Sequence, residues 1–122
     1  MTRTFWLTGC LLALTAVAAG AFGAHGLRGR IPEDLLAVFE TGARYQMYHA
    51  LALLGVAWAS ANWPNPLATV AGWLFVGGTV FFSGSLYLLA LSGTRWLGAI
   101  TPIGGVMFLA GWACLALVPW KG

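Results

Sequence analysis

The stretch TGARYQMYH, from Thr41 to His49, runs without a break into the apolar stretch ALALLGVAWASA, which ends at Ala61. Its first part gathers a tyrosine, a glutamine and a histidine, whereas its second part has the composition of a helix that crosses a membrane. Lipid offers no hydrogen-bond partners, so the polar side chains of such a helix have to face other helices or a cavity. This combination predicts a bundle of membrane helices built around the stretch.

The composition of the whole chain supports a membrane protein. Of its 122 residues, 60% are hydrophobic and 7% are charged, whereas a soluble domain carries about 25% charged residues. The formal net charge is +3, but the basic residues are scattered singly and form no patch of the kind that binds nucleic acid. We therefore expect the lipid bilayer to be the main partner of the chain, and we expect no nucleic acid.

The pattern of apolar runs and turns predicts an all-α fold, a four-helix transmembrane bundle in one integral membrane domain (1–122). A span needs about 20 apolar residues, which places the spans at about 4–24, 43–61, 67–91 and 96–118. Pro32 and the acids after it suit the first turn of a helix. We therefore expect a short surface helical lead-in, 32–40, to the second span. Whether that helix continues straight through Gly42 stays open.

Three local features of the sequence lead to further predictions. Glu40 and Arg44 are four residues apart and can form an ion pair on a helix. The proline of Thr101-Pro102 should kink or open the first third of the last span. Cys10 and Cys114 lie in apolar runs without metal-type spacing, so we expect inert thiols; their redox state stays open, because an even number of spans places them at similar depth.

The orientation in the membrane rests on few charges. Four arginines lie on the side of the first and third connections, and two basic residues lie on the side of the termini: Arg28, Arg30, Arg44 and Arg95 against Arg3 and Lys121. The positive-inside rule then favours cytoplasmic connections, by a small margin that leaves the orientation open.

Helical phasing places the polar residues of the opening stretch on one face. At about 100° per residue, Thr41, Gly42, Tyr45, Gln46 and His49 fall within an arc of about 140°. Glu40, Arg44 and Tyr48 point to the other side. The third span carries a matching stripe, because its hydroxyl residues recur every four positions. The candidates for a ligand site or a polar network are His25, Thr41, Tyr45, Gln46, His49, Thr79, Ser83, Ser85, Tyr87 and Thr101.

Three interpretations of these candidates stay open. The first is interhelical hydrogen bonding, with the polar face of the second helix bonded to Thr79, Ser83, Ser85 and Thr101. The second is a small polar cavity for a proton, an ion or a small molecule, in which His49 titrates. The third is a haem or metal held by His25 and His49. Two histidines without a supporting motif are weak evidence, so we predict no cofactor and no metal site.

Enzymatic activity is not expected. A serine nucleophile needs a base within hydrogen-bond reach, and His49 is the sole candidate base inside the membrane for Ser83 or Ser85. The acids cluster in the lead-in segment instead.

Four motifs resemble a known family. They are GAFGAH at Gly20 to His25, TGxxYQxxHALALL at Thr41 to Leu54, GTxxFSGSLYLLALS at Gly78 to Ser92, and TPxGGxxFLAGW at Thr101 to Trp112. In this order they resemble the YgdD/YwdK family of small multi-pass bacterial inner-membrane proteins of unknown function, which has a small eukaryotic transmembrane relative. The resemblance implies a multi-pass helical protein of the cell inner membrane and implies no activity.

Two classes of function follow. The first is a non-enzymatic structural or accessory subunit that acts by helix–helix assembly, as a homo-oligomer or within a larger membrane complex. The alternative is a small transporter, channel or sensor with a polar intramembrane site around His49. A cavity bordered by Tyr45, Gln46 and His49 would favour the alternative. Fully bonded polar groups and outward small-residue faces would favour assembly.

Overall fold

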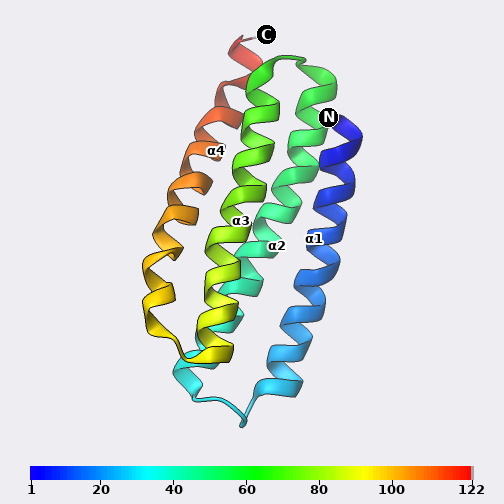
Figure 1. Cartoon of the computed structure of the whole chain (residues 1–122). Coiled ribbons are helices and arrows are strands. Elements are labelled where there is room, and N and C mark those ends of the chain that lie inside the picture. Colours follow the sequence, from blue (N-terminus) through cyan, green and yellow to red (C-terminus); the bar gives the residue numbers. More distant parts are fainter. Residues whose placement is uncertain (122) are drawn as a thin grey trace.

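The computed structural model describes residues 1–121 and shows an all-α protein (Figure 1). Four long helices account for most of it: α1 (Thr2–Phe22), α2 (Glu33–Asn62), α3 (Pro66–Ser92) and α4 (Thr101–Lys121). A π-helical segment, η1 (Gly23–Leu27), extends α1, and a 3-10 helix, η2 (Arg95–Ala99), precedes α4. The predicted fold class, a bundle of four long helices, is confirmed.

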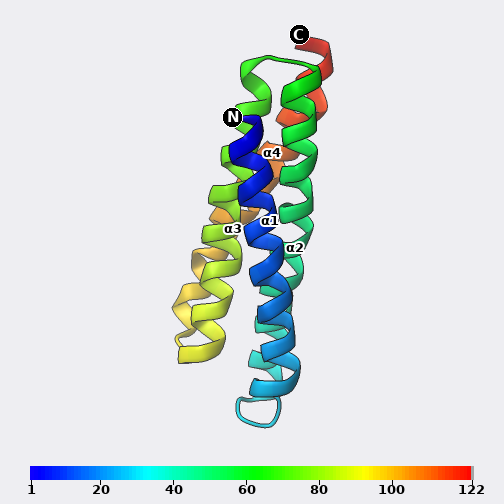
Figure 2. The ribbon, with the colours of Figure 1, turned by 90° about the vertical axis from the view of Figure 1, so that its right-hand side faces the viewer.

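Successive helices run in opposite directions and pack in chain order. Helix α2 packs against α1 and α3, and α3 packs against α4, so α1 and α4 lie at opposite edges of the view (Figure 1). The view turned by 90° shows α1 in the foreground, with α2 to its right and α3 to its left (Figure 2). Helix α2 is thus enclosed on two sides, whereas each edge helix turns a broad apolar surface outward.

Three segments are long and apolar enough to cross a bilayer: Thr2–Leu27, Pro66–Ser92 and Arg95–Lys121. Helix α2 is not among them, because Arg44, Gln46 and His49 lower its hydropathy. Two of these polar residues, Gln46 and His49, are buried against neighbouring helices. The least apolar helix is therefore the one that the bundle shields best from lipid.

Helix α2 is an uninterrupted α-helix from Glu33 through Gly42. Its first turns, the predicted lead-in, expose Glu33 and Asp34 but bury one apolar side. That side forms a cluster with residues of η1 and of the last turn of α3: Leu27, Leu35, Leu36, Phe39, Leu89 and Ala90. The lead-in is thus anchored to the bundle by apolar packing as well as by its backbone.

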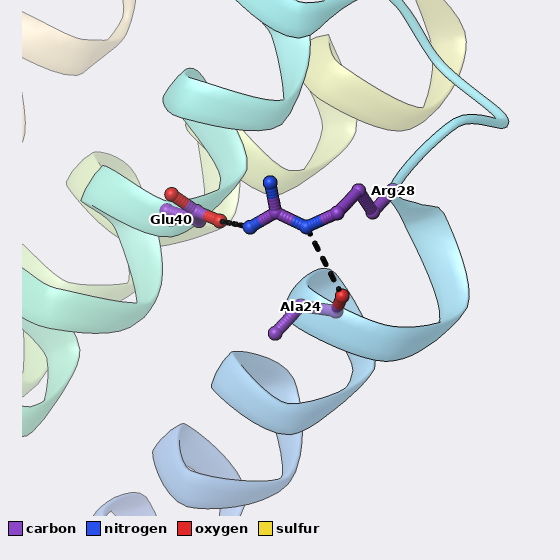
Figure 3. A network of polar contacts seen from close by, with 3 residues as sticks. All are labelled: Ala24, Arg28 and Glu40. Atoms are coloured by element: carbon purple, nitrogen blue, oxygen red, sulfur yellow. Dashed lines mark hydrogen bonds and ion pairs between the residues drawn. The ribbon is translucent and has the colours of Figure 1, made fainter.

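The predicted pair between Glu40 and Arg44 is wrong. Glu40 instead lies 3.6 Å from Arg28, which comes from the end of η1, and the Arg28 Nε atom also donates to the Ala24 carbonyl (Figure 3). Helical spacing alone could not show that Glu40 pairs with an arginine from another segment.

The predicted opening of the first third of the last span is present, but it precedes Thr101-Pro102 instead of lying at the proline. The chain leaves α3 through Gly93, whose φ of 72° is readily adopted by glycine, and passes through η2. Helix α4 then begins at Thr101. Pro102 therefore stands in the first turn, where a proline removes no helical hydrogen bond.

Glycines allow α3 and α4 to approach closely. A Cβ added at Gly104 would stand 2.4 Å from the backbone nitrogen of Phe82 and 2.8 Å from the carbonyl oxygen of Gly78. Gly78 in turn faces the ring of Phe108. The Phe108 ring belongs to the largest core cluster, which draws on all four helices. This close contact sets the position of α4 relative to the polar residues of α2.

Candidate functional site

Gln46 ties three helices together. Its side chain is 6% exposed, and its Nε2 atom donates to the Leu12 carbonyl at 2.9 Å and to the Thr15 hydroxyl at 2.7 Å, both on α1. The Tyr87 hydroxyl of α3 donates to its Oε1 atom at 2.7 Å. All of these side-chain hydrogen bonds of Gln46 are therefore made with neighbouring helices.

The hydroxyl groups predicted to form a stripe on α3 make hydrogen bonds with several different partners. Ser83 donates to the Gly42 carbonyl of α2 at 2.7 Å, as the interhelical interpretation expects for this helix pair. The Thr101 hydroxyl lies 2.6 Å from Ser85 and links α4 to α3. Two threonines donate hydrogen bonds to carbonyls of their own helices: Thr79 of α3 to Phe75, and Thr41 of α2 to Ala37.

His49 is held as a neutral imidazole. The indole N–H of Trp112 donates to His49 Nε2 at 3.1 Å, and His49 Nδ1 lies 2.8 Å from the Tyr45 carbonyl. An indole nitrogen can only donate, so Nε2 is the acceptor and the proton sits on Nδ1. The Phe108 ring stacks on the imidazole with a centroid separation of 3.5 Å. Both ring nitrogens are thus engaged within the bundle.

Tyr45 lies at the edge of the polar face rather than in its centre. Its side chain is 36% exposed, and its ring contacts those of Tyr48 and Phe82. Its hydroxyl makes no hydrogen bond within residues 1–121, so it differs from the other polar groups of the face.

The structure does not bring the two histidines together. His25 is exposed on η1, at the end of the bundle where α2 begins. His49 lies about 24 Å farther along α2 than Glu33, at 1.5 Å per residue. Within the described part of the chain, no three His, Cys, Asp or Glu side chains gather as metal ligands would. The arrangement therefore offers no support for a haem held by both histidines.

Both cysteines are free thiols. Cys10 is exposed on α1, and Cys114 is half-buried on α4. Because these helices lie at opposite edges of the bundle (Figure 1), the structure gives no disulfide between them.

A cavity of about 480 Å³ opens beside His49. It is lined by residues of α2, α3 and α4: Tyr45, His49, Phe82, Pro102, Gly105, Val106, Phe108, Leu109 and Trp112. Gln46 is not part of its wall. Sequence reasoning missed Trp112 and Thr15 as partners of the polar face, because helical spacing does not show which residue of a neighbouring helix lies opposite.

A second cavity, of about 490 Å³, lies at the end of the bundle where η1 meets α2, and it was not predicted from the sequence. Its wall includes Arg28, Glu33 and Glu40. The side chains of the Arg28–Glu40 pair are 67% and 38% exposed, and such surface pairs contribute about 0 to 1 kcal/mol. Figure 3 shows Arg28 reaching across from the end of η1 to α2 at this place.

Four antiparallel helices, three of them able to cross a bilayer, define a multi-pass α-helical membrane protein. Residues 19–105 match the family described as "Protein of unknown function (DUF423)", and the chain belongs to this family. The chain is 47% identical to the UPF0382 membrane protein YwdK of Bacillus subtilis (strain 168) over 120 residues, which cover 98% of each chain.

Two further relatives are UPF0382 membrane proteins of staphylococci. The protein of Staphylococcus aureus (strain bovine RF122 / ET3-1) is 47% identical over 98% of this chain and 97% of its own. The protein of Staphylococcus saprophyticus is 48% identical over 98% of each chain. No solved structure matches the chain. The resemblance inferred from the four motifs is therefore confirmed, for a family whose function is unknown.

Proposed function

We propose that this protein is a non-enzymatic structural or accessory subunit of the inner membrane that acts by helix–helix assembly. The observation that carries the proposal is the state of the interior: within residues 1–121, every buried side-chain nitrogen or oxygen has a hydrogen-bond partner. The Gln46 bonds join α1, α2 and α3, and the bonds of Thr101 and Trp112 attach α4. A network that is already complete serves to hold helices together.

Outward glycines support assembly with further helices. Gly20, Gly55 and Gly84 lie on α1, α2 and α3, and an added Cβ at any of them would have no neighbour within 4 Å. Small residues at such positions let the backbones of two membrane helices approach closely. Gly84 also lies in a groove of about 310 Å³ beside η2, lined by Val80 and Leu88 among others.

We propose further that α2 also crosses the membrane, as the fourth span. The crossing segments of α1 and α3 run in the same direction, and α2 connects the end of one to the start of the other (Figure 1). At 1.5 Å per residue its 30 residues extend about 45 Å, which exceeds the hydrocarbon core of about 30 Å. The lead-in therefore has room to lie in the headgroup layer.

A small transporter, channel or sensor has weaker support. That function needs a polar passage bordered by Tyr45, Gln46 and His49. The cavity beside His49 has Tyr45 and His49 in its wall but not Gln46, and most of the remaining lining is apolar. Such a wall suits a molecule that dissolves in lipid better than it suits an ion or a proton.

The test is native mass spectrometry of the protein in lipid nanodiscs formed directly from membranes. We expect a homo-oligomer or a stoichiometric protein partner, and we expect Gly84→Leu to disrupt it because the added side chain fills the groove. Gly20→Leu and Gly55→Leu add the same bulk to open glycines outside this groove, so they show whether α1 or α2 takes part in the assembly as well. A wild-type chain that is monomeric and free of partners contradicts the proposal.

A further inference from the structure

We propose that two adjoining cavities along α2 together bind one phospholipid whose headgroup carries both a phosphate and a primary ammonium group. The cavity where η1 meets α2 receives the headgroup, and a groove between α1 and α2 receives the first part of an acyl chain. The inference rests on the proposed crossing of the membrane by α2. It is independent of whether the protein acts by assembly.

The two cavities share a wall residue, Glu40. The cavity where η1 meets α2, of about 490 Å³, also has Arg28 and Glu33 in its wall. The α1–α2 groove, of about 330 Å³, combines Arg44 with three small residues: Ala16, Gly20 and Ala43. Because one side chain belongs to both walls, the two cavities can hold the polar and the apolar end of a single molecule.

The charged residues of α2 in these walls follow one another along a single face. At about 100° per residue, Glu33, Glu40 and Arg44 fall within an arc of about 40°. At 1.5 Å per residue, Glu40 and Arg44 lie about 10 Å and about 16 Å farther along α2 than Glu33. The hydrocarbon core takes about 30 Å of the roughly 45 Å of α2, and the lead-in occupies the rest. Arg44 therefore stands near the boundary between headgroups and hydrocarbon.

Arg44 supplies the contact with the phosphate. Its side chain is exposed, and no ion pair of Arg44 occurs within residues 1–121. Glu40, one turn away, instead lies 3.6 Å from Arg28 (Figure 3). A cation without a counter-charge is costly at the edge of the hydrocarbon, and a lipid phosphate is the anion that this layer provides. The guanidinium group can donate two parallel hydrogen bonds to it.

Glu33 supplies the contact with the ammonium group. Its carboxylate lines the cavity where η1 meets α2 and forms no ion pair in the part of the chain that the structure describes. It lies on the headgroup side of Arg44, where the terminal group of a lipid headgroup is found. The two walls together carry two positive and two negative side chains: Arg28, Arg44, Glu33 and Glu40. A zwitterion balances this set, whereas an anionic headgroup would meet the two carboxylates without a cation of its own.

The experiment measures lipid binding by native mass spectrometry of delipidated protein in detergent. Phosphatidylethanolamine, phosphatidylcholine and phosphatidylglycerol with identical acyl chains are added at equal concentrations, and each bound lipid is identified by its mass. We expect one phosphatidylethanolamine per chain, bound at least about fivefold more tightly than either competitor. Phosphatidylcholine has the same charges but no N–H to donate, so it isolates the hydrogen bonds of the ammonium group.

Charge variants assign the two ends of the headgroup. Arg44→Gln should weaken binding of phosphatidylethanolamine about tenfold by removing the phosphate contact. Arg30→Gln is the matched control, because Arg30 is exposed at the same end of the bundle but lines neither cavity. Glu33→Gln should retain a bound lipid but remove the preference for phosphatidylethanolamine over phosphatidylglycerol.

Glycine variants test the place of the acyl chain. An added Cβ at Gly20 or at Gly55 would have no neighbour within 4 Å, so both positions accept a leucine without strain on the backbone. Gly20 lines the α1–α2 groove, whereas Gly55 lies outside both cavities. Gly20→Leu should therefore weaken lipid binding at least about fivefold, and Gly55→Leu should leave it unchanged.

Three outcomes would overturn the proposal. Equal binding of the three lipids, or equal losses with Arg44→Gln and Arg30→Gln, shows a general attraction to headgroups. Tighter binding of phosphatidylglycerol makes the site one for anionic lipids. A change in oligomeric state with Gly20→Leu makes the groove an interface between copies. The same spectra report the oligomeric state of the wild type, so loss of the lipid is distinguished from failure of the assembly proposal, and labelling at the two ends of α2 tests the crossing separately.

Discussion

The Tyr87 hydroxyl lies 2.7 Å from the side-chain oxygen of Gln46 and donates a hydrogen bond to it, which joins α3 to α2. The amide nitrogen of the same glutamine continues the connection to the Leu12 carbonyl and the Thr15 hydroxyl on α1. One buried side chain therefore fixes the mutual position of three helices in a medium that offers no competing water.

Removing these hydrogen bonds should destabilise the bundle, and Gln46→Ala should do so more than Tyr87→Phe. Tyr87→Phe deletes a single donor and should cost about 1 kcal/mol. Gln46→Ala should cost about 2 kcal/mol, because it leaves the hydroxyl of Tyr87 buried without its partner. Unfolding in mixed micelles by titration with sodium dodecyl sulfate measures both. Tyr48→Phe is the control, since Tyr48 is 50% exposed; an equal loss for this variant would show that the effect is not due to the network.

The close contact between α3 and α4 gives a second prediction. Gly104→Ala places a Cβ 2.4 Å from the backbone nitrogen of Phe82, and backbone cannot move aside as the end of a side chain can. We expect a loss of about 1 to 3 kcal/mol, as for other overpacked contacts. Gly105→Ala meets no atom within 4 Å and should change stability little. Similar unfolding midpoints for the two variants would refute this account of the contact.

The sequence predicted the helices and the polar face better than it predicted their partners. Helical phasing correctly placed Gly42, Gln46 and His49 toward the interior, where all three are buried. The same arc included Tyr45, which is 36% exposed. A phase angle gives a direction from the helix axis, but burial in that direction depends on where the next helix lies. A cavity between α2, α3 and α4 lies beside Tyr45, so its side chain stays partly exposed.

Two other predictions differ from the structure for the same physical reason. Glu40 pairs with Arg28 of another segment rather than with Arg44 of its own helix, and Pro102 stands in the first turn of α4 rather than in its interior. Both depend on how the connections fold in three dimensions. Composition and spacing determine which segments are helical, whereas register and connection geometry determine which side chains meet.

The bond between Trp112 and His49 predicts one tautomer. Nitrogen-15 NMR of histidine-labelled protein should show His49 protonated at Nδ1 and unprotonated at Nε2, because Nε2 accepts from the indole N–H at 3.1 Å. Trp112→Phe removes this donor and should shift the Nε2 resonance while the Nδ1 bond to the Tyr45 carbonyl persists. His25, which is exposed, provides a reference in the same spectrum. A spectrum with the proton on Nε2 would contradict the assignment.

The ion pair between Asp34 and Arg95 predicts a dependence on pH. The hydrogen bond from Arg95, 3.1 Å long, lowers the pKa of Asp34 below its ordinary value of 3.8. A carboxyl group whose pKa is lowered by folding stabilises the fold fully above 3.8, and that contribution is lost as the pH falls through the lower, folded value. The pair joins α2 to η2 at an exposed place, so the effect should be small.

The measurement compares thermal unfolding of the wild type and of Asp34→Asn in detergent. The wild type should be slightly more stable at pH 7, and the difference should shrink as the pH falls below 3.8 and Asp34 becomes protonated. Glu33→Gln is the neighbouring control, because no ion pair of Glu33 occurs within residues 1–121. A difference between wild type and Asp34→Asn that grows on acidification would reverse the predicted sign.

Single cysteines test the path of the chain through the membrane. In a background with Cys10→Ala and Cys114→Ala, we place one cysteine at a time by Glu33→Cys, Asn62→Cys or Ser92→Cys, all at exposed positions beside connections and none removing an arginine. If α2 crosses the bilayer, a membrane-impermeant maleimide added to intact cells labels Asn62→Cys, or it labels the other two variants. The positive-inside rule favours labelling of Asn62→Cys, since four arginines cluster toward the opposite end. Labelling of Glu33→Cys and Asn62→Cys from the same side would show that α2 does not cross, whereas a reversed pattern would overturn the orientation and leave the four spans intact.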